Sequence, residues 1–241
     1  QGASDISPAV GETHIIEGIV TASFPNLSGY FVQEEDGDQD GDSATSEGIF
    51  VYSPSLALPE AGSLVRVLGE VAEVFNKTQL VVSEINPDCG TGSVTATALT
   101  LPFDSVDSME ALEGMLVTSS SDLTVTDTFS LGRYGEVLLS NGRRFVPTNL
   151  FAAGSPEAVA LAAENELNQI TLDDGVNGQN PDVVVYPAGG LSASNPLRSG
   201  DTVAALTGVM DFSFSLYRII PVEQPTIVAS NPRTEAPDLE L

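Results

Sequence analysis

The segment "GSLVRVLGEVAEVFNKTQLVV" (62–82) carries the clearest β-signature in this chain. Its apolar residues alternate or run together around a central glycine and a short turn, as in paired β-strands. A loosely similar segment, "GDTVAALTGVMDFSFSLYRII" (200–220), follows later with one residue of slippage. Both copies run glycine, polar residue, strand, glycine, strand, short turn, strand. This repetition predicts two tandem units of one ancestry.

Short runs rich in Val, Ile, Thr, Phe and Tyr surround the first copy, and Gly, Pro, Asn and Asp bound them. These features are typical of an all-β protein. Five strands within about 75 residues is the number expected of a small Greek-key barrel such as the OB-fold. The candidates are "THIIEGIVTASF" (13–24), "GYFVQEE" (29–35), "GIFVYS" (48–53), "SLVRVLGEVAEVF" (63–75) and "TQLVVSEI" (78–85).

A second series of candidate strands follows. It comprises "GMLVTSS" (114–120), "LTVTDTF" (123–129), "GEVLLS" (135–140), "RRFVPTN" (143–149), "DVVVYP" (182–187), "DTVAALTGVMDF" (201–212) and "LYRIIPVE" (216–223). The sequence therefore predicts an all-β chain of two tandem OB-like Greek-key barrels. We expect the first barrel in residues 1–97 and the second in residues 98–229. The Pro-rich, polar stretch 230–241 reads as a linker that has lost its next domain.

Two short helices interrupt the strand pattern. "SPEAVALAAENELN" (155–168) begins with Ser155 as a capping residue, Pro156 in the first turn and Glu157 near the positive end of the helix. We expect this helix within the second unit, between strands, where an OB-fold often carries a helix. "DSMEALEG" (107–114) reads as one or two turns that Gly114 ends, at the junction of the units.

The charge of the chain is strongly negative, with 34 acidic and 8 basic residues and a formal net charge of −26. Such a surface repels polyanions and attracts cations. No window approaches the run of about 18 apolar residues that a membrane span needs. Gln1 is not a start methionine and no signal sequence follows it, so we interpret the chain as a processed or excised product.

The single cysteine, Cys89, lies in "NPDCGTG", which we expect to be a loop. It is either a buried spectator thiol or a partner for a cysteine elsewhere. The single histidine, His14, cannot form a His-rich metal site and is expected to be structural.

An acidic loop, "DGDQDGDSATSE" (36–47), satisfies the calcium-loop pattern D-x-[DN]-x-[DN]-G-x5-E at every specified place. Alternate carboxylates of a tight loop can turn toward one centre, and a final Glu can add two oxygens. Strands flank the loop, so we expect a calcium-binding β-hairpin and no EF-hand. The predicted ligands of Ca²⁺ are Asp36, Asp38, Asp40, Asp42 and Glu47.

Two alternatives stay open for acidic segments. The loop 36–47 could be a solvated turn that binds nothing, because acidic composition favours chance matches. The turn "TLDDGVNGQNPD" (171–182) matches no fixed ligand spacing, and it is either a simple loop or a second cation site.

No G-x-S-x-G, H-E-x-x-H, P-loop or C-x-x-C motif is present, and we predict no catalytic residues. OB-folds can bind single strands with aromatic platforms and basic side chains. The candidates for nucleic-acid binding are Arg143, Arg144, Arg133 and Tyr134. Against this reading, strand aromatics commonly fill a core, and 8 basic residues among 34 acids make a poor phosphate groove.

The stretches "EGIVTASF", "GYFVQEEDGDQDGDSATSEGIFVYS" and "AGSLVRVLGEVAEVFNKTQL" resemble the OB-like region of secreted bacterial ExeM/NucH-type endonucleases. The stretch "ITLDDGVNGQNPDVVVYPAGGLSASNPLRSGDTVAALTGVMDFSFSLYRIIPV" does so too, and the resemblance covers about residues 8–235. In that family this region precedes an endonuclease/exonuclease/phosphatase-type domain that cleaves DNA with divalent metal. The resemblance implies secretion, extracellular DNA as a possible partner and a nuclease domain in cis.

The leading expectation is a non-catalytic, calcium-stabilised tandem OB-like region of a secreted DNA-degrading nuclease. Such a region would position the catalytic domain or its substrate. The alternatives are a nucleic-acid-binding module and a surface-adhesion or carbohydrate-binding module.

Overall fold

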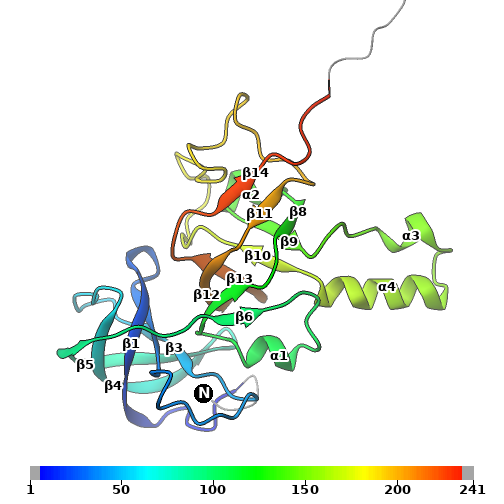
Figure 1. Cartoon of the computed structure of the whole chain (residues 1–241). Coiled ribbons are helices and arrows are strands. Elements are labelled where there is room, and N and C mark those ends of the chain that lie inside the picture. The colour runs from blue at the N-terminus through cyan, green and yellow to red at the C-terminus, as the bar shows by residue number, and fades with distance from the viewer. Residues whose placement is uncertain (1–5, 235–241) are drawn as a thin grey trace, which may run out of the picture.

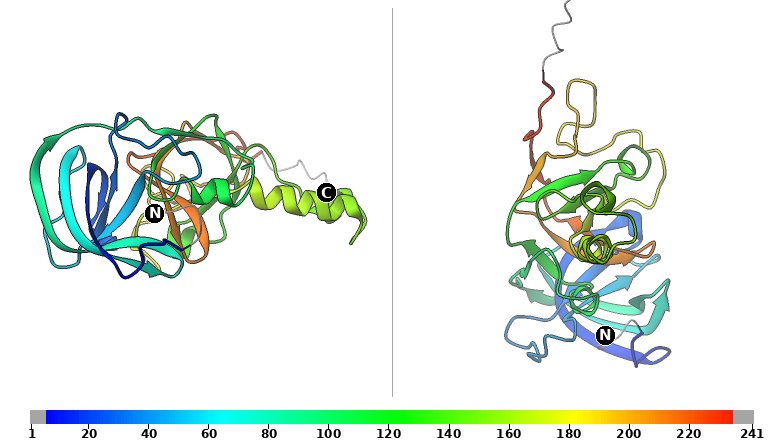
Figure 2. Two further views of the ribbon diagram at one scale, coloured as in Figure 1. Left: turned by 90° about the horizontal axis from the view of Figure 1, so that it is seen from below. Right: turned by 90° about the vertical axis from the view of Figure 1, so that its right-hand side faces the viewer.

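The computed structural model describes residues 6–234, which form a closed five-stranded barrel followed by a nine-stranded sheet (Figure 1). The view from below in Figure 2 shows the barrel at one end of the molecule and a projecting helix at the other. The predictions of an all-β chain and of a closed barrel in the first unit are confirmed. No helix among the described residues is both long and apolar enough to cross a membrane.

The barrel has the strand order β1-β2-β3-β5-β4 and closes between β4 and β1. Its only parallel pair among the described strands joins β3 to β5, and every other neighbour is antiparallel. The first part of β1, up to Ile19, pairs with β4, and the part from Ile19 onward pairs with β2, in a ladder whose register shifts between Val20 and Ala22. The strands are β1 (Thr13–Phe24), β2 (Gly29–Gln33), β3 (Gly48–Tyr52), β4 (Ser63–Val74) and β5 (Lys77–Thr91), with a 3-10 turn, η1 (Pro25–Leu27), after β1.

Alternation along these strands builds the barrel core, because successive side chains point to opposite faces. In β4 the inward residues Val65, Val67 and Val71 are buried, whereas Arg66 and Glu70 between them are exposed. They pack with Val20, Tyr30, Val32, Val51 and Leu80 from the other strands.

The second unit is a single sheet in the order β14-β11-β8-β9-β10-β13-β12-β7-β6. Its strands are β6 (Thr97–Leu99), β7 (Leu116–Ser119), β8 (Leu123–Asp127), β9 (Val137–Ser140), β10 (Ile170–Leu172), β11 (Thr202–Ala204), β12 (Thr207–Ser213), β13 (Leu216–Pro221) and β14 (Thr226–Val228). A second closed barrel is not confirmed. In the barrel, the single strand β1 pairs with both of its neighbours and closes the ring. In the second unit, the chain is interrupted between β7 and β8, and no single described strand has this role.

The pairings inside the second sheet nevertheless repeat those of the barrel. The hairpin β12–β13 corresponds to β4–β5, and β10 pairs parallel with β13 as β3 does with β5. β7 pairs with β12 and β8 pairs with β9, which divides between two strands the partners that β1 holds in the barrel. β6, β11 and β14 are additions at the edges.

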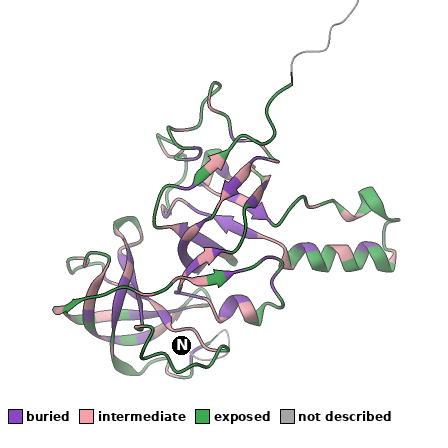
Figure 3. Cartoon of the chain, in the orientation of Figure 1, coloured by how far each residue is buried: buried purple, intermediate pink, exposed green. Residues whose placement is uncertain are grey.

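The predicted capped helix is confirmed as α4 (Pro156–Leu167), whose Ser155 hydroxyl accepts a hydrogen bond from Ala158 N at 3.2 Å. It projects from the sheet, largely exposed, beside α3 (Pro147–Leu150) (Figure 3). The predicted helix at the junction is α1 (Asp107–Glu110), and a further short helix is α2 (Leu131–Tyr134).

Three local predictions are wrong. "RRFVPTN" forms no strand, because the chain leaves the sheet here, the Phe145 carbonyl accepts from Asn165 of α4, and α3 follows. "DVVVYP" is irregular, and Val183 is 65% exposed because this segment lies outside the ladder. Cys89 lies in the last part of β5 and in no loop, since β5 extends past it to Thr91 along β4.

A small cluster joins the two units. Ala22, Phe31 and Phe50 of the barrel pack against Val209 of β12 and Ile220 of β13. The main core of the second unit, which includes Leu139 and Met210, lies beyond this cluster. The two units are therefore packed against each other through apolar side chains.

Candidate functional site

The acidic loop joins β2 to β3, and a hydrogen bond from Glu34 N to the Glu47 carbonyl, 3.1 Å long, closes its base. Inside the loop Asp40 Oδ1 accepts from Asp42 N at 2.6 Å, and Asp42 Oδ1 accepts from Ala44 N at 3.0 Å. These are local turns that Asp side chains commonly form with the following backbone. Bonds between its Asp side chains and the following backbone N–H groups thus shape the loop between its two ends.

The ends of the loop also touch the connection between the two units. Asp36 accepts hydrogen bonds from the Thr95 backbone N–H at 2.9 Å and from the Thr95 hydroxyl at 2.5 Å. Thr95 lies between β5 and β6, and these bonds lower the pKa of Asp36. At the other end, the Ser46 hydroxyl donates to the Glu113 carbonyl at 2.5 Å. The acidic loop therefore spans the junction of the units.

The carboxylates of the loop repel one another. Burial, followed by repulsion from Asp38 and Asp40, raises the pKa of Glu34. Burial, followed by Asp40 and Glu34, also raises the pKa of Glu47. A bound cation relieves repulsion of this kind.

Within residues 6–234, no group of three or more His, Cys, Asp or Glu side chains converges in a way that could hold a metal ion. The structure places Asp36, Asp38, Asp40, Asp42 and Glu47 on one loop, but Asp36 faces Thr95. Calcium binding by these residues stays a prediction.

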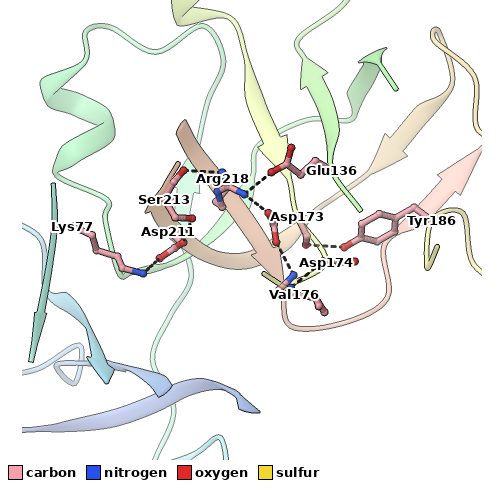
Figure 4. Close-up of polar contacts among 10 residues, drawn as sticks. Lys77, Glu136, Asp173, Asp174, Val176, Tyr186, Asp211, Ser213 and Arg218 are labelled. Atoms are coloured by element: carbon pink, nitrogen blue, oxygen red, sulfur yellow. Dashed lines mark hydrogen bonds and ion pairs between the residues drawn. The ribbon is translucent and has the colours of Figure 1, made fainter. Parts of the chain in front are cut away.

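The second acidic turn (171–182) is paired with a positively charged side chain, that of Arg218. Arg218 of β13 donates through Nη1 to Glu136 at 2.9 Å and to Asp173, and through Nη2 to the Ser213 carbonyl at 2.7 Å (Figure 4). Arg218 is 2% exposed. Burial raises the pKa of Asp173, and Arg218 opposes that rise. The guanidinium group balances the negative charge of Glu136 and Asp173. In a second cation site, a metal ion would take this role.

The predicted nucleic-acid residues fall into two groups along the chain, one on each side of β9. Arg133 binds Gln179 Oε1 through Nε at 3.1 Å and Nη2 at 2.8 Å, and it lies 5.1 Å from the centroid of the Tyr134 ring. These two residues precede β9, whereas Arg143 and Arg144 follow it. They therefore flank opposite ends of that strand.

Arg143 and Arg144 also differ from each other in surroundings. The guanidinium of Arg143 stacks 4.5 Å from the centroid of the Phe145 ring. Arg144 donates to Gln169 at 2.9 Å, and its burial lowers its pKa, although Glu166 and Asp127 lie close enough to oppose that effect. These two carboxylates would repel a phosphate that approaches Arg144.

An apolar groove lies between the two units. Its volume is about 390 Å³, in the range of about 300–1,000 Å³ that small-molecule sites have. The tips of the β4–β5 and β12–β13 hairpins line it together, with Phe75 from the first tip and Phe214 from the second. Other lining residues are Leu27, Tyr52, Val74, Gln79, Asn177, Phe212, Ser213 and Ser215.

Charged groups at the groove form a pair that crosses between the units. Lys77 Nζ lies 3.0 Å from Asp211 Oδ1 and 4.3 Å from the centroid of the Phe50 ring (Figure 4). The side chains of Lys77 and Asp211 are 13% and 2% exposed. Lys77 is the only lysine of the chain, and Asp211 neutralises its charge at the floor of the groove.

Behind this pair lies a buried acid, Glu113, which is 2% exposed. Burial, then repulsion from Glu110 and Asp211, raises the pKa of Glu113 to about 9, although Lys77 lowers it. Glu113 is therefore protonated at neutral pH. Tyr217 donates to Glu110 at 2.6 Å and holds that second acid at the same junction.

Sequence reasoning missed the groove, although the repeat contained a signal for it. Aligning 62–82 with 200–220, with the one-residue slip, places Phe75 and Phe214 at the same point of two hairpin turns. A Phe in a two-residue turn is unusual, because such turns favour Asn, Asp or Gly. That the two turns face one cavity follows only from the packing of the units.

The chain belongs to a protein family described as a domain of unknown function (DUF8508), whose profile matches residues 75–232. No curated protein and no solved structure matches it. The matched range begins in the β4–β5 turn and includes both Phe75 and Phe214. The family description names no activity.

Proposed function

We propose that this member of the family is the non-catalytic, calcium-stabilised, tandem OB-like region of a secreted DNA-degrading nuclease. In this role it positions the catalytic domain or the substrate. The contact of the acidic loop with the junction carries the proposal. Asp36 binds Thr95 of the connecting segment, and Ser46 binds the Glu113 carbonyl of the second unit.

A cation on this loop would act on both units at once. Its donors would be carboxylate oxygens, the ligands that Ca²⁺ prefers. The raised pKa values of Glu34 and Glu47 favour a bound positive charge at the same place. The residues therefore fit calcium in their chemistry, and we assign the ligands Asp36, Asp38, Asp40, Asp42 and Glu47. By holding the junction rigid, the ion would fix the orientation of whatever follows the second unit.

The OB-like character of the second unit also belongs to this proposal. Its pairings repeat those of the barrel if β7 and β8 are counted as one interrupted strand. The helical arm of α3 and α4 offers a surface for a neighbouring domain, since Val146, Leu150 and Val159 are 60%, 52% and 61% exposed.

The calcium proposal is tested by calorimetric titration and thermal melting of the chain. We expect saturable uptake of Ca²⁺ and a melting temperature that falls when EGTA is added. Replacing Asp38 and Asp40 together by Asn should remove both effects. Replacing Asp122, an exposed acid of the second unit, by Asn is the matched control and should leave them intact. A melting temperature indifferent to EGTA, with no heat of binding, would refute calcium stabilisation.

The non-catalytic claim has a separate test. The chain is incubated with plasmid and single-stranded DNA in Mg²⁺ and Ca²⁺, and reproducible cleavage would overturn the claim. The alternative role, DNA binding, predicts affinity that falls with salt and with the joint replacement of Arg143 and Arg144 by Ala. If the chain does not bind DNA in low salt with calcium, that alternative is rejected.

A further inference from the structure

We propose that the groove between the β4–β5 and β12–β13 hairpins binds a neutral carbohydrate, with a sugar ring held between the Phe75 and Phe214 side chains. The proposal is independent of calcium binding and of any link to a nuclease. It starts from the backbone of the two turns.

Both turns hold a phenylalanine in the left-handed region. Phe75 and Asn76 have φ values of 55° and 64°, and Phe214 and Ser215 have values of 53° and 62°. The flanking pairs are Val74 with Lys77 and Ser213 with Leu216, so each turn has two central residues with positive φ, as in a type I′ hairpin. A bulky residue is strained in this conformation, and such strain clusters at ligand sites.

The strain is not offset by burial. Phe75 is 88% exposed and Phe214 is 67% exposed. The two similar hairpins thus each present an exposed, strained phenylalanine at the same position, and both rings line one cavity. Neither ring contributes to either core, so contact with a ligand is what these side chains can provide.

Bonds behind the turns hold the second ring in place. Arg218 donates to the Ser213 carbonyl at 2.7 Å, and its guanidinium lies 5.5 Å from the centroid of the Phe214 ring. Glu136 and Asp173 fix Arg218 in turn. The network at the second acidic turn therefore supports the wall of the groove and pre-organises it for a ligand.

The lining selects the class of ligand. Aromatic rings suit a ligand with a flat apolar face, and Gln79, Asn177, Ser213 and Ser215 supply amide and hydroxyl groups for hydroxyl partners. Lys77, the cation at the floor, already pairs with Asp211. With a net charge of −26 on the chain, a phosphate chain is repelled. A sugar ring combines an apolar C–H face with hydroxyl edges and carries no charge, and these observations favour it over a single-stranded nucleic acid.

The test titrates the whole chain with maltohexaose, cellohexaose, laminarihexaose, mannohexaose and chitohexaose at millimolar concentrations, and with oligothymidylate. Saturation-transfer NMR and calorimetry detect binding. We expect at least one hexasaccharide to bind, and Phe75→Ala and Phe214→Ala each to weaken it by about tenfold or more. Phe129→Ala is the matched control, because Phe129 is 93% exposed and lies outside the groove.

Three results would overturn the proposal. They are no binding of any of these hexasaccharides, binding that the Phe75→Ala, Phe214→Ala double variant retains, and binding of oligothymidylate alone with the salt dependence of a phosphate contact. Circular dichroism and melting of each variant show that the fold persists. Calcium uptake measured on the same samples keeps this result separate from the calcium test.

Discussion

Lys77 Nζ in the barrel lies 3.0 Å from Asp211 Oδ1 in the second sheet, and both side chains are largely withdrawn from water. The Ser213 hydroxyl also donates to Asp211, at 2.9 Å. A buried carboxylate that loses its cation keeps its desolvation cost without the compensating attraction. This pair therefore couples the two units electrostatically.

We expect Lys77→Met to lower the free energy of unfolding by about 3 kcal/mol, since it leaves Asp211 charged and buried. Urea unfolding measures the loss, and adding Asp211→Asn should restore part of it. The matched control is Arg66→Met. Arg66 lies 3.0 Å from Glu17 with both side chains about half exposed, so its loss should cost under about 1 kcal/mol. Equal costs for the two substitutions would contradict the coupling.

Glu113 makes stability depend on pH. Its pKa is about 9 in the folded protein, against 4.5 as the ordinary value for an exposed Glu. The folded state therefore holds a proton that the unfolded chain releases, and stability falls as pH rises from 4.5 to about 9. Glu110, Asp211 and Lys77 surround this carboxyl.

Glu113→Gln should remove this dependence, because the amide cannot ionise and can still accept a hydrogen bond. At pH 8 we expect the variant to be more stable than the parent by about 2–4 kcal/mol, with little difference near pH 4. Urea midpoints across the pH series measure it. Glu60→Gln, at an exposed site, should track the parent throughout. A pH slope in Glu113→Gln as steep as that of the parent would place the titrating group elsewhere.

The barrel could be predicted from sequence because its strands alternate cleanly and its turns carry Gly and Asn. Residues of β4 show this best, with buried Val65 and Val67 on either side of exposed Arg66. The capped helix α4 was also predictable, since Ser155 and Pro156 are local signals. At Val183 the local signals were misleading. The apolar run around it suggests a strand, but this segment belongs to no strand of the sheet.

The candidate site was less predictable, because it depends on contacts between residues far apart in the sequence. Lys77 and Asp211 are separated by 134 positions, and no local pattern couples them. The acidic loop was visible as a motif, but its bond to Thr95 was not. Arg218 looked like one basic residue among few, and its role as partner of Asp173 required the register of β13 against β10.

The backbones of the two units are in close contact where Gly48 meets Gly114. A β-carbon on Gly48 would overlap the Gly114 carbonyl group and the Met115 nitrogen, which are backbone atoms that cannot rotate away. We therefore expect Gly48→Ala to cost about 1–3 kcal/mol in stability. Gly37→Ala is the control, because open space surrounds Gly37. If thermal melting shows the same small change for both variants, the two backbones are not in close contact in solution.

The two strained turns give the last prediction. Asn adopts left-handed φ more readily than Phe and is favoured in type I′ turns. Phe75→Asn should therefore raise the free energy of unfolding by about 0.5–1 kcal/mol, since the ring it removes is 88% exposed. Phe214→Asn should raise the free energy of unfolding by less, because it also removes the contact of the ring with Arg218.

Chemical denaturation of each variant checks this gain, and Phe129→Asn is the control. Phe129 is 93% exposed and is absent from the residues with positive φ in the described chain, so its replacement relieves no strain. A stabilising effect at the two turns but not at Phe129 would mean that the parent chain holds these rings at a cost to its own stability. Such a cost is expected where a side chain is retained for a ligand. If Phe75→Asn destabilises the protein instead, the ring has a packing role, and the turn is not a strained ligand wall.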